Sequence, residues 1–250
     1  MRDQRLAWAE KMLVDGNYNR IEDIAMTDMQ TALPQASDQG ILPAQTLRGM
    51  IAADQIKLAA PLAEKQLQPA SLDLRLGTVA YRIRASFLPA RHSAVQERIE
   101  SLSLHKIELT HGAVLETGCV YIVPLMETLA LPEHVSAATN PKSSTGRLDV
   151  FTRVIADGVN AFDFVPNGYR GPLFAEICPQ TFPIIVRSGS TLSQIRFRIG
   201  QPAESDESLR ELHRNHTLIA GGSAADIQNG IALSVDLSGD QMGGSDGLVG

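Results

Sequence analysis

The amino-acid sequence predicts a mostly β protein, a sandwich or distorted barrel of short strands with a few short helices. Short apolar runs recur between residues 102 and 198, and Gly or Pro residues separate them, as expected for strands joined by turns. The composition agrees, because 20 Gly, 13 Pro and only 5% aromatic residues suit strands and turns better than a helix bundle.

The N-terminal 40 residues are expected to be an extension of the main domain. An amphipathic helix is predicted over residues 3–14, while residues 17–40 show no clear period and are typical of a linker. A second helix is predicted over Pro43–Asp54, because proline suits the first helical turn and the apolar residues that follow recur at helical spacing.

The strands are predicted from alternating polar and apolar residues. Ser71–Gly77 places three leucines on one face, which is typical of a half-buried strand, and Val79–Ile83 can continue it. Further strands are expected at Ala113–Leu115, Cys119–Val123, Leu173–Ile177, Ile184–Val186 and Leu192–Phe197.

The β domain is expected to span residues 41–200, followed by a linker at 201–227. Ser234–Leu237 resembles Ser71–Leu74, so residues 228–250 are expected to begin a second, truncated domain of the same kind.

Composition and charge exclude several classes of partner. The net charge of −6 does not favour binding to nucleic acid or anionic lipid, and no stretch approaches the roughly 18 apolar residues of a membrane span. Because the chain has only Cys119 and Cys178 and no apolar signal-peptide core, we expect a cytoplasmic protein without nucleic-acid or membrane partners.

No zinc site of the base-deaminase type is present in the sequence. Such sites need a P-C-x-x-C pair and an H-x-E glutamate, and this chain has neither. His213 and His216 form an H-x-x-H that no Glu or Cys completes, so no metal-binding residue is predicted.

Pro141–Arg147 is a candidate anion-binding turn. A helical turn here would present backbone N–H groups, place Ser143 and Arg147 on one face, and add the charge of Lys142. This arrangement suits a phosphate chain. The alternative is a capped surface turn with a salt-bridging arginine.

Glu176 is a candidate general acid/base. On a strand, Leu173, Ala175 and Ile177 would face one way and Phe174 and Glu176 the other, which leaves one carboxylate in an apolar strand. The alternative is an ordinary outward-facing strand glutamate.

Three motifs in order resemble those of dCTP deaminases, a family of the dUTPase-like superfamily. They are Gln68–Gly77, Lys142–Leu148, and Gly168–Gly171 with the following Glu176, and they cover roughly residues 40–200. The resemblance implies a dUTPase-like distorted β-barrel or jelly-roll (β-clip) fold, a homotrimer, and active sites that form between subunits.

The same resemblance implies dCTP as the substrate, with Glu176, Arg147 and Ser143 as the catalytic residues. Arg147 would orient Glu176, which would move protons to the base and to ammonia without zinc, while Mg²⁺ would be carried on the triphosphate. The substrate-binding residues that it implies are Lys142, Ser144, Gly146, Ala156, Asp163, Tyr169, Phe174 and Ala175.

Alternatives remain open from the sequence. A dUTPase carries an Asp before the tyrosine where this chain has Asn167-Gly168-Tyr169, but a bifunctional deaminase and pyrophosphatase remains possible. A non-catalytic nucleotide-binding or assembly module is the other alternative. The chain departs from the family at Asp149, where a small residue is usual, and has no counterpart of the family's triphosphate-covering segment after Gly200.

Overall fold

The computed structural model describes residues 33–35, 39–89, 94–200, 203–219 and 225–233. The helix predicted over residues 3–14, most of the 17–40 segment and the sequence echo at Ser234–Leu237 lie outside these residues. The chain divides into two units, Met1–Gln201 and Pro202–Gly250. Each unit is described by itself.

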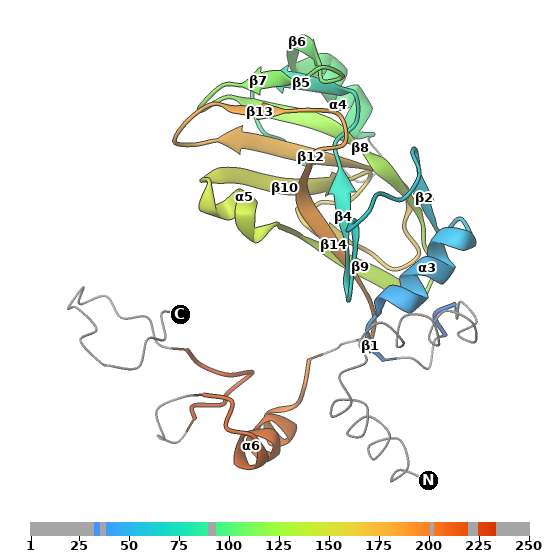
Figure 1. Cartoon of the computed structure of the whole chain (residues 1–250), viewed down its shortest axis with the longest axis vertical. Coiled ribbons are helices and arrows are strands. Elements are labelled where there is room, and N and C mark those ends of the chain that lie inside the picture. The colour runs from blue at the N-terminus through green and yellow to red at the C-terminus, as the bar shows by residue number, and fades with distance from the viewer. Residues whose placement is uncertain (1–32, 36–38, 90–93, 201–202, 220–224, 234–250) are drawn as a thin grey trace, which may run out of the picture. The chain divides into compact units, whose positions relative to one another are not determined.

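The first unit contains two antiparallel six-stranded sheets and one strand pair (Figure 1). The first sheet runs β11 (Phe164–Val165), β9 (Val135–Pro141), β14 (Thr191–Ile199), β4 (Ser71–Arg75) and β3 (Leu67–Gln68), with β1 (Gly40–Ile41) on β14. The second runs β10 (Val150–Ala156), β12 (Arg170–Pro179), β8 (Val120–Ala130), β5 (Val79–Ile83) and β6 (Ser103–Glu108), with β2 (Ile56–Leu58) on β8. The pair is β7 (Ala113–Leu115) and β13 (Ile184–Val186).

Among the described residues few helices accompany these sheets, which confirms the predicted mostly β fold. They are α3 (Ala44–Ala52), α4 (Val95–Leu102) and α5 (Ser143–Arg147) in the first unit and α6 (Asp206–Asn215) in the second. Pro43 precedes α3 in an extended conformation, close to the predicted helix start. The sequence analysis did not predict α4, whose buried side chains are only Val95 and Ile99. Within the described part of the chain, no helix is long and apolar enough to cross a membrane.

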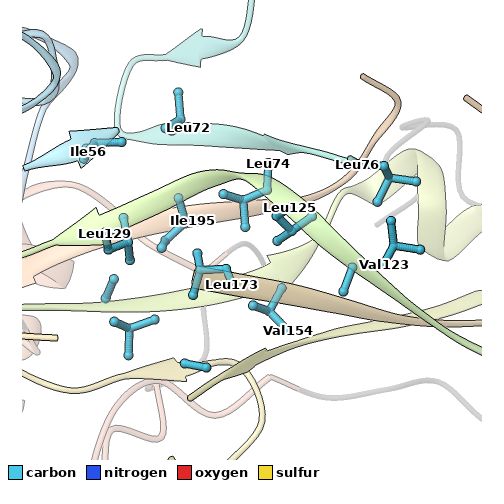
Figure 2. Close-up of a cluster of buried hydrophobic side chains, with 14 of the residues drawn as sticks. Ile56, Leu72, Leu74, Leu76, Val123, Leu125, Leu129, Val154, Leu173 and Ile195 are labelled. Carbon is cyan, nitrogen blue, oxygen red and sulfur yellow. The ribbon is translucent and has the colours of Figure 1, made fainter. Parts of the chain in front are cut away.

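The main core lies between the two sheets. Leu72, Leu74 and Leu76 are at most 1% exposed, and Figure 2 shows Leu74 and Leu76 facing apolar side chains of the second sheet such as Val123 and Leu125. The prediction of a half-buried strand was wrong, because all five residues of β4 are buried. Fully burying each leucine contributes about 1.5–3 kcal/mol. This packing holds the second sheet, whose strands β10 and β12 carry the candidate site, against the first sheet.

One buried ion pair crosses this core. Glu127 is fully buried and Arg75 is 5% exposed, and the Arg75 Nε donates to Glu127 Oε1 at 2.8 Å. The same carboxylate accepts from the Arg75 backbone N–H and from the Gln66 amide, while the guanidinium donates to the carbonyls of Ala60 and Pro61. Both carboxylate oxygens are therefore bonded, and the network fixes the segment that leads into β4.

The second unit holds the helix α6 inside the range that was predicted to be a linker. Ser205 caps it by accepting from the Ser208 N–H, which explains why a helix starts in this polar stretch. The Asp206 carboxylate accepts from the N–H groups of Asn229 and Gly230, and these hydrogen bonds lower the pKa of Asp206.

Candidate functional site

Strand β12 places Glu176 in the interior. Its neighbours Ala175 and Ile177 pack into the core between the sheets, while Phe174 packs into a second apolar cluster on the opposite face of the strand. Glu176 points to that second face and is only 2% exposed. The carboxylate is therefore not the solvent-exposed strand glutamate that the sequence left as an alternative.

The partner of Glu176 is Arg153 of the neighbouring strand β10. The two residues are paired in the sheet register, and Arg153 Nε donates to Glu176 Oε1 at 2.7 Å. The second carboxylate oxygen, Oε2, is buried and has no hydrogen-bond partner among the described residues. The ion pair thus leaves one carboxylate oxygen occupied and one free.

Within this chain Arg147 does not contact Glu176, so the orienting role predicted for Arg147 in a site between subunits stays a prediction. Arg147 is exposed on α5, and none of the hydrogen bonds and ion pairs found in the described segments includes it. Arg153 takes the place at Glu176 because directly opposed residues of neighbouring strands lie about 5 Å apart.

Arg153 is itself held by several contacts. Its Nη2 donates to Ser86 Oγ at 2.8 Å, and its guanidinium carbon lies 3.4 Å from the ring centre of Phe162 and 5.0 Å from that of Phe151. The arginine side chain is 25% exposed, so it reaches from the buried carboxylate towards the surface.

A pocket of about 800 Å³ adjoins this arginine. Its lining residues include Gly146 of α5, Thr152 and Arg153 of β10, Phe162 and Asp163. Of the predicted site residues, Gly146 and Asp163 therefore contribute to this pocket.

Asp163 is fixed at the wall of that pocket. One of its carboxylate oxygens accepts from Thr139 Oγ1 at 2.7 Å and from the Val154 N–H at 2.8 Å. Burial raises the pKa of Asp163 above its usual range, and these two hydrogen bonds partly offset the effect. Its backbone has a φ of 58°, a left-handed conformation that aspartate tolerates.

A second pocket of about 340 Å³ contains the predicted phosphate-binding group. Lys142, Ser143 and Ser144 line it, together with polar residues that include Asp73. Lys142 Nζ forms an ion pair with the Asp73 carboxylate and donates to Thr191 Oγ1 at 3.2 Å. Because Gly146 lines the larger pocket, the short helix α5 and the residue before it contribute to both pockets.

Asp149 adopts a backbone conformation that explains the departure from the family pattern. Its φ is 52°, which glycine, Asn and Asp tolerate best, and its carboxylate accepts from Thr181 Oγ1 at 2.6 Å. Asp149 lines the larger pocket just after α5.

The remaining predicted substrate-binding residues lie inside the described unit. The side chains of Ala156, Phe174 and Ala175 are at most 4% exposed and pack in apolar clusters. The Tyr169 hydroxyl donates to the Pro172 carbonyl at 2.6 Å, and burial raises the pKa of this tyrosine to about 12. These four side chains line neither of the two pockets.

Gly171 explains why Tyr169 packs where it does. A Cβ on Gly171 would lie 2.7 Å from the Tyr169 hydroxyl, so only glycine leaves room for the ring. The Tyr169 hydroxyl also accepts from the Asp157 N–H at 3.0 Å, and the tyrosine thereby ties the turn that follows β10 to the start of β12.

Among the residues that the structure describes, no group of three or more His, Cys, Asp or Glu side chains is arranged to hold a metal ion.

Two curated relatives of this chain carry the same name. A curated relative from Parafrankia sp., named dCTP deaminase, dUMP-forming, is 30% identical over 169 residues, which cover 66% of this chain and 79% of the relative. A relative of the same name from Beutenbergia cavernae is 28% identical over 166 residues, covering 66% of this chain and 82% of the relative.

The fold also matches a solved structure. The crystal structure of 2'-deoxycytidine 5'-triphosphate deaminase from Agrobacterium tumefaciens superposes with a TM-score of 0.75 and 55% identity. The match covers 80% of this chain but only 59% of that chain.

A family model supports the same assignment over most of the first unit. The model of the N-terminal domain of 2'-deoxycytidine 5'-triphosphate deaminases matches residues 38–201, which are more than half of the chain and contain both pockets and Glu176. The chain therefore belongs to the dCTP deaminase family.

Proposed function

We propose that this protein hydrolyses dCTP to dUTP and ammonia, with Glu176 as the group that transfers protons. The observation that supports this proposal is the environment of the Glu176 carboxylate. The residue is 2% exposed, one carboxylate oxygen accepts from Arg153, and the other is buried without a hydrogen-bond partner among the described residues. A buried acceptor without a partner is unusual in a stable scaffold and suits a group that binds water or substrate.

Deamination needs several proton transfers that one carboxylate can perform. As the water oxygen bonds to C4 of cytosine, Glu176 takes a proton from the water and delivers it to N3. The proton of the resulting C4 hydroxyl then passes to the amino group, the C4–N bond breaks, and ammonia leaves a uracil carbonyl behind. The proton balance closes with one water consumed and no metal at the base.

The two pockets provide separate places for the ends of the nucleotide. Lys142 and Ser144 would bind the triphosphate in the smaller pocket, and Mg²⁺ would arrive with the phosphates because it prefers phosphate oxygens and water as ligands. Asp163, which is fixed at the wall of the larger pocket, would accept a hydrogen bond from the sugar.

The test is incubation of the pure protein with dCTP and Mg²⁺, followed by separation of the products. We expect uracil nucleotide and free ammonia, at a rate that a zinc chelator leaves unchanged after Mg²⁺ is restored. Unchanged dCTP would contradict the proposal and favour the non-catalytic binding module. Activity that is lost on chelation and restored by zinc alone would contradict the metal-free chemistry.

A second candidate function is the conversion of dCTP to dUMP. The specific observation is that both curated relatives described above carry the name dUMP-forming, whereas the Agrobacterium protein is called a deaminase only. The same incubation separates the candidates, since dUTP accumulates in one case and dUMP with pyrophosphate in the other.

We further propose that the active site is completed by a second subunit of a homotrimer. Ser143 and Arg147 are exposed on α5, whereas Glu176 lies buried in β12, so the proposed catalytic groups are not assembled within one chain. An arrangement in which α5 of one subunit reaches Glu176 of the next would bring them together. Sedimentation should give a trimer or a multiple of one.

Mixed oligomers test this arrangement directly. We expect Arg147→Ala and Glu176→Gln to be inactive alone but to regain about a quarter of wild-type activity when co-expressed, because one subunit contact in four then combines an intact α5 with an intact carboxylate. A mixture no more active than the separate variants would place each site within one chain.

Lys142→Ala is expected to act mainly on binding. Removing the ammonium should raise KM by about 10- to 100-fold, the equivalent of a charge-assisted hydrogen bond of about 1.5–3 kcal/mol, with kcat changed little. Steady-state kinetics and thermal unfolding should be measured together, because Asp73 loses its partner.

Lys106→Ala is the matched control for Lys142→Ala, since Lys106 is a lysine in an exposed ion pair with Glu108. A loss of kcat without a change in KM at Lys142 would contradict its assignment to phosphate binding.

A further inference from the structure

We propose that Arg153 is a positioning residue for the deamination: it fixes the Glu176 carboxylate through Oε1 and thereby makes Oε2 the oxygen that exchanges protons with water and base. This inference rests on the proposed function, because it assigns a role within the reaction of Glu176. The predicted orienting residue, Arg147, lies on α5 and does not contact Glu176 within the chain. The arginine that does contact Glu176 within the chain is Arg153.

The hydrogen bond from Nε determines the orientation of the carboxylate. Nε carries a single N–H that lies in the guanidinium plane, so a 2.7 Å contact to Oε1 restrains the rotation of the carboxylate. Oε2 then keeps a defined direction although nothing in the described chain binds it. A proton-transfer group gains from this restraint, because misplacing a reacting atom by about 1 Å can cost 10²-fold in rate.

The guanidinium is immobilised from other sides. Ser86 accepts from Nη2, and the ring of Phe162 lies against the guanidinium at 3.4 Å, with the ring of Phe151 at 5.0 Å. These cation–π contacts keep the plane of the guanidinium fixed while its charge reaches the pocket that Arg153 and Phe162 line. The carboxylate therefore takes its direction from a rigid arginine.

Another arginine–glutamate pair of the described residues, Arg75–Glu127, shows what a purely structural pair looks like. In the Arg75–Glu127 pair both carboxylate oxygens accept hydrogen bonds, and the arginine is 5% exposed and lines none of the pockets described above. In the Arg153–Glu176 pair one oxygen is free and the arginine lines a pocket of about 800 Å³. The difference points to a pair kept incomplete for a ligand.

The decisive experiment compares Arg153→Met and Arg153→Lys in the full-length protein. Arg153→Met should lower kcat by about 10- to 100-fold, with dCTP affinity by calorimetry and KM changed less than threefold, because the effect is on the position of the proton carrier. Arg153→Lys keeps the charge but lacks the in-plane Nε–H, so its kcat should lie between those of the wild type and Arg153→Met. Millimolar guanidinium chloride should restore part of the kcat of Arg153→Met and none of that of Glu176→Gln.

Two further variants keep the test decisive if Arg153→Met does not fold. Phe162→Leu leaves the arginine in place but removes the ring from its face, and it should lower kcat without raising KM. Arg187→Met, at an exposed arginine outside both pockets, is the matched control and should retain wild-type kcat.

The outcomes distinguish this inference from the proposed function. If Glu176→Gln is inactive while Arg153→Met keeps wild-type kcat, the role of Arg153 is overturned and the function stands. If Arg153→Met loses dCTP binding and thermal stability together with kcat, and guanidinium restores nothing, the pair is structural and the inference is again overturned. Wild-type protein that leaves dCTP unchanged would overturn both.

Discussion

Glu176→Gln is expected to bind dCTP with near wild-type affinity and to deaminate it about 10²–10⁴-fold more slowly, or worse, because general acid–base groups contribute this much and one group here serves several transfers. The glutamine keeps the size of the glutamate, and its carbonyl oxygen can still accept from Arg153 Nε, so the buried pocket should survive. It cannot accept the proton of the attacking water.

The measurement is single-turnover deamination together with calorimetric titration of dCTP. Glu133→Gln is the matched control, because Glu133 is an exposed glutamate with no hydrogen bond or ion pair among the described contacts. Turnover of Glu176→Gln above about a tenth of wild type, well inside the 10²-fold lower bound, would show that Glu176 is a plain strand carboxylate.

Glu127→Ala is expected to destabilise the protein by about 3–5 kcal/mol, the usual result of removing one partner of a buried ion pair. The substitution removes the acceptor for the Arg75 guanidinium, for the Arg75 backbone N–H and for the Gln66 amide, all of which are buried. An unpaired arginine that is 5% exposed would then remain in the core.

Urea unfolding at a fixed protein concentration measures this loss, since the stability of an oligomer depends on concentration. Glu108→Ala is the control, because it breaks an ion pair with Lys106 whose side chains are 55% and 64% exposed, and such pairs contribute no more than about 1 kcal/mol. Equal losses for the two variants would contradict the structural role of the Arg75–Glu127 pair.

Much of the fold could be predicted from local patterns. The alternation at Ser71–Gly77 correctly predicted a strand with three buried leucines, and Pro43 marked the beginning of α3 within one residue. It did not predict that the polar face of this strand is buried too, because Asp73 and Arg75 find their charged partners on distant segments. Such patterns are readable because the period of a strand or helix decides which side chains meet the core. The helix α4 was missed, since only two of its eight residues are buried and the apolar signal is weak.

The sequence by itself determined the family and gave candidate residues for its site. The three motifs in order resemble dCTP deaminases and make Glu176 and the Lys142–Arg147 segment the candidates, and the family match over residues 38–201 confirms the family. A motif records which residues a reaction requires, but it does not say which charges are neighbours in space.

Only the tertiary structure decided which charged side chains of the site pair with each other. Arg153 meets Glu176 across 23 residues of sequence, and Lys142 meets Asp73 across 69. Both pairings follow from strand register and from the order of strands in the two sheets, and a shift of one residue would turn Arg153 to the other face of its strand. Register depends on the packing of the whole core, which is why Arg153 was visible in the sequence as a residue but not as the partner of Glu176.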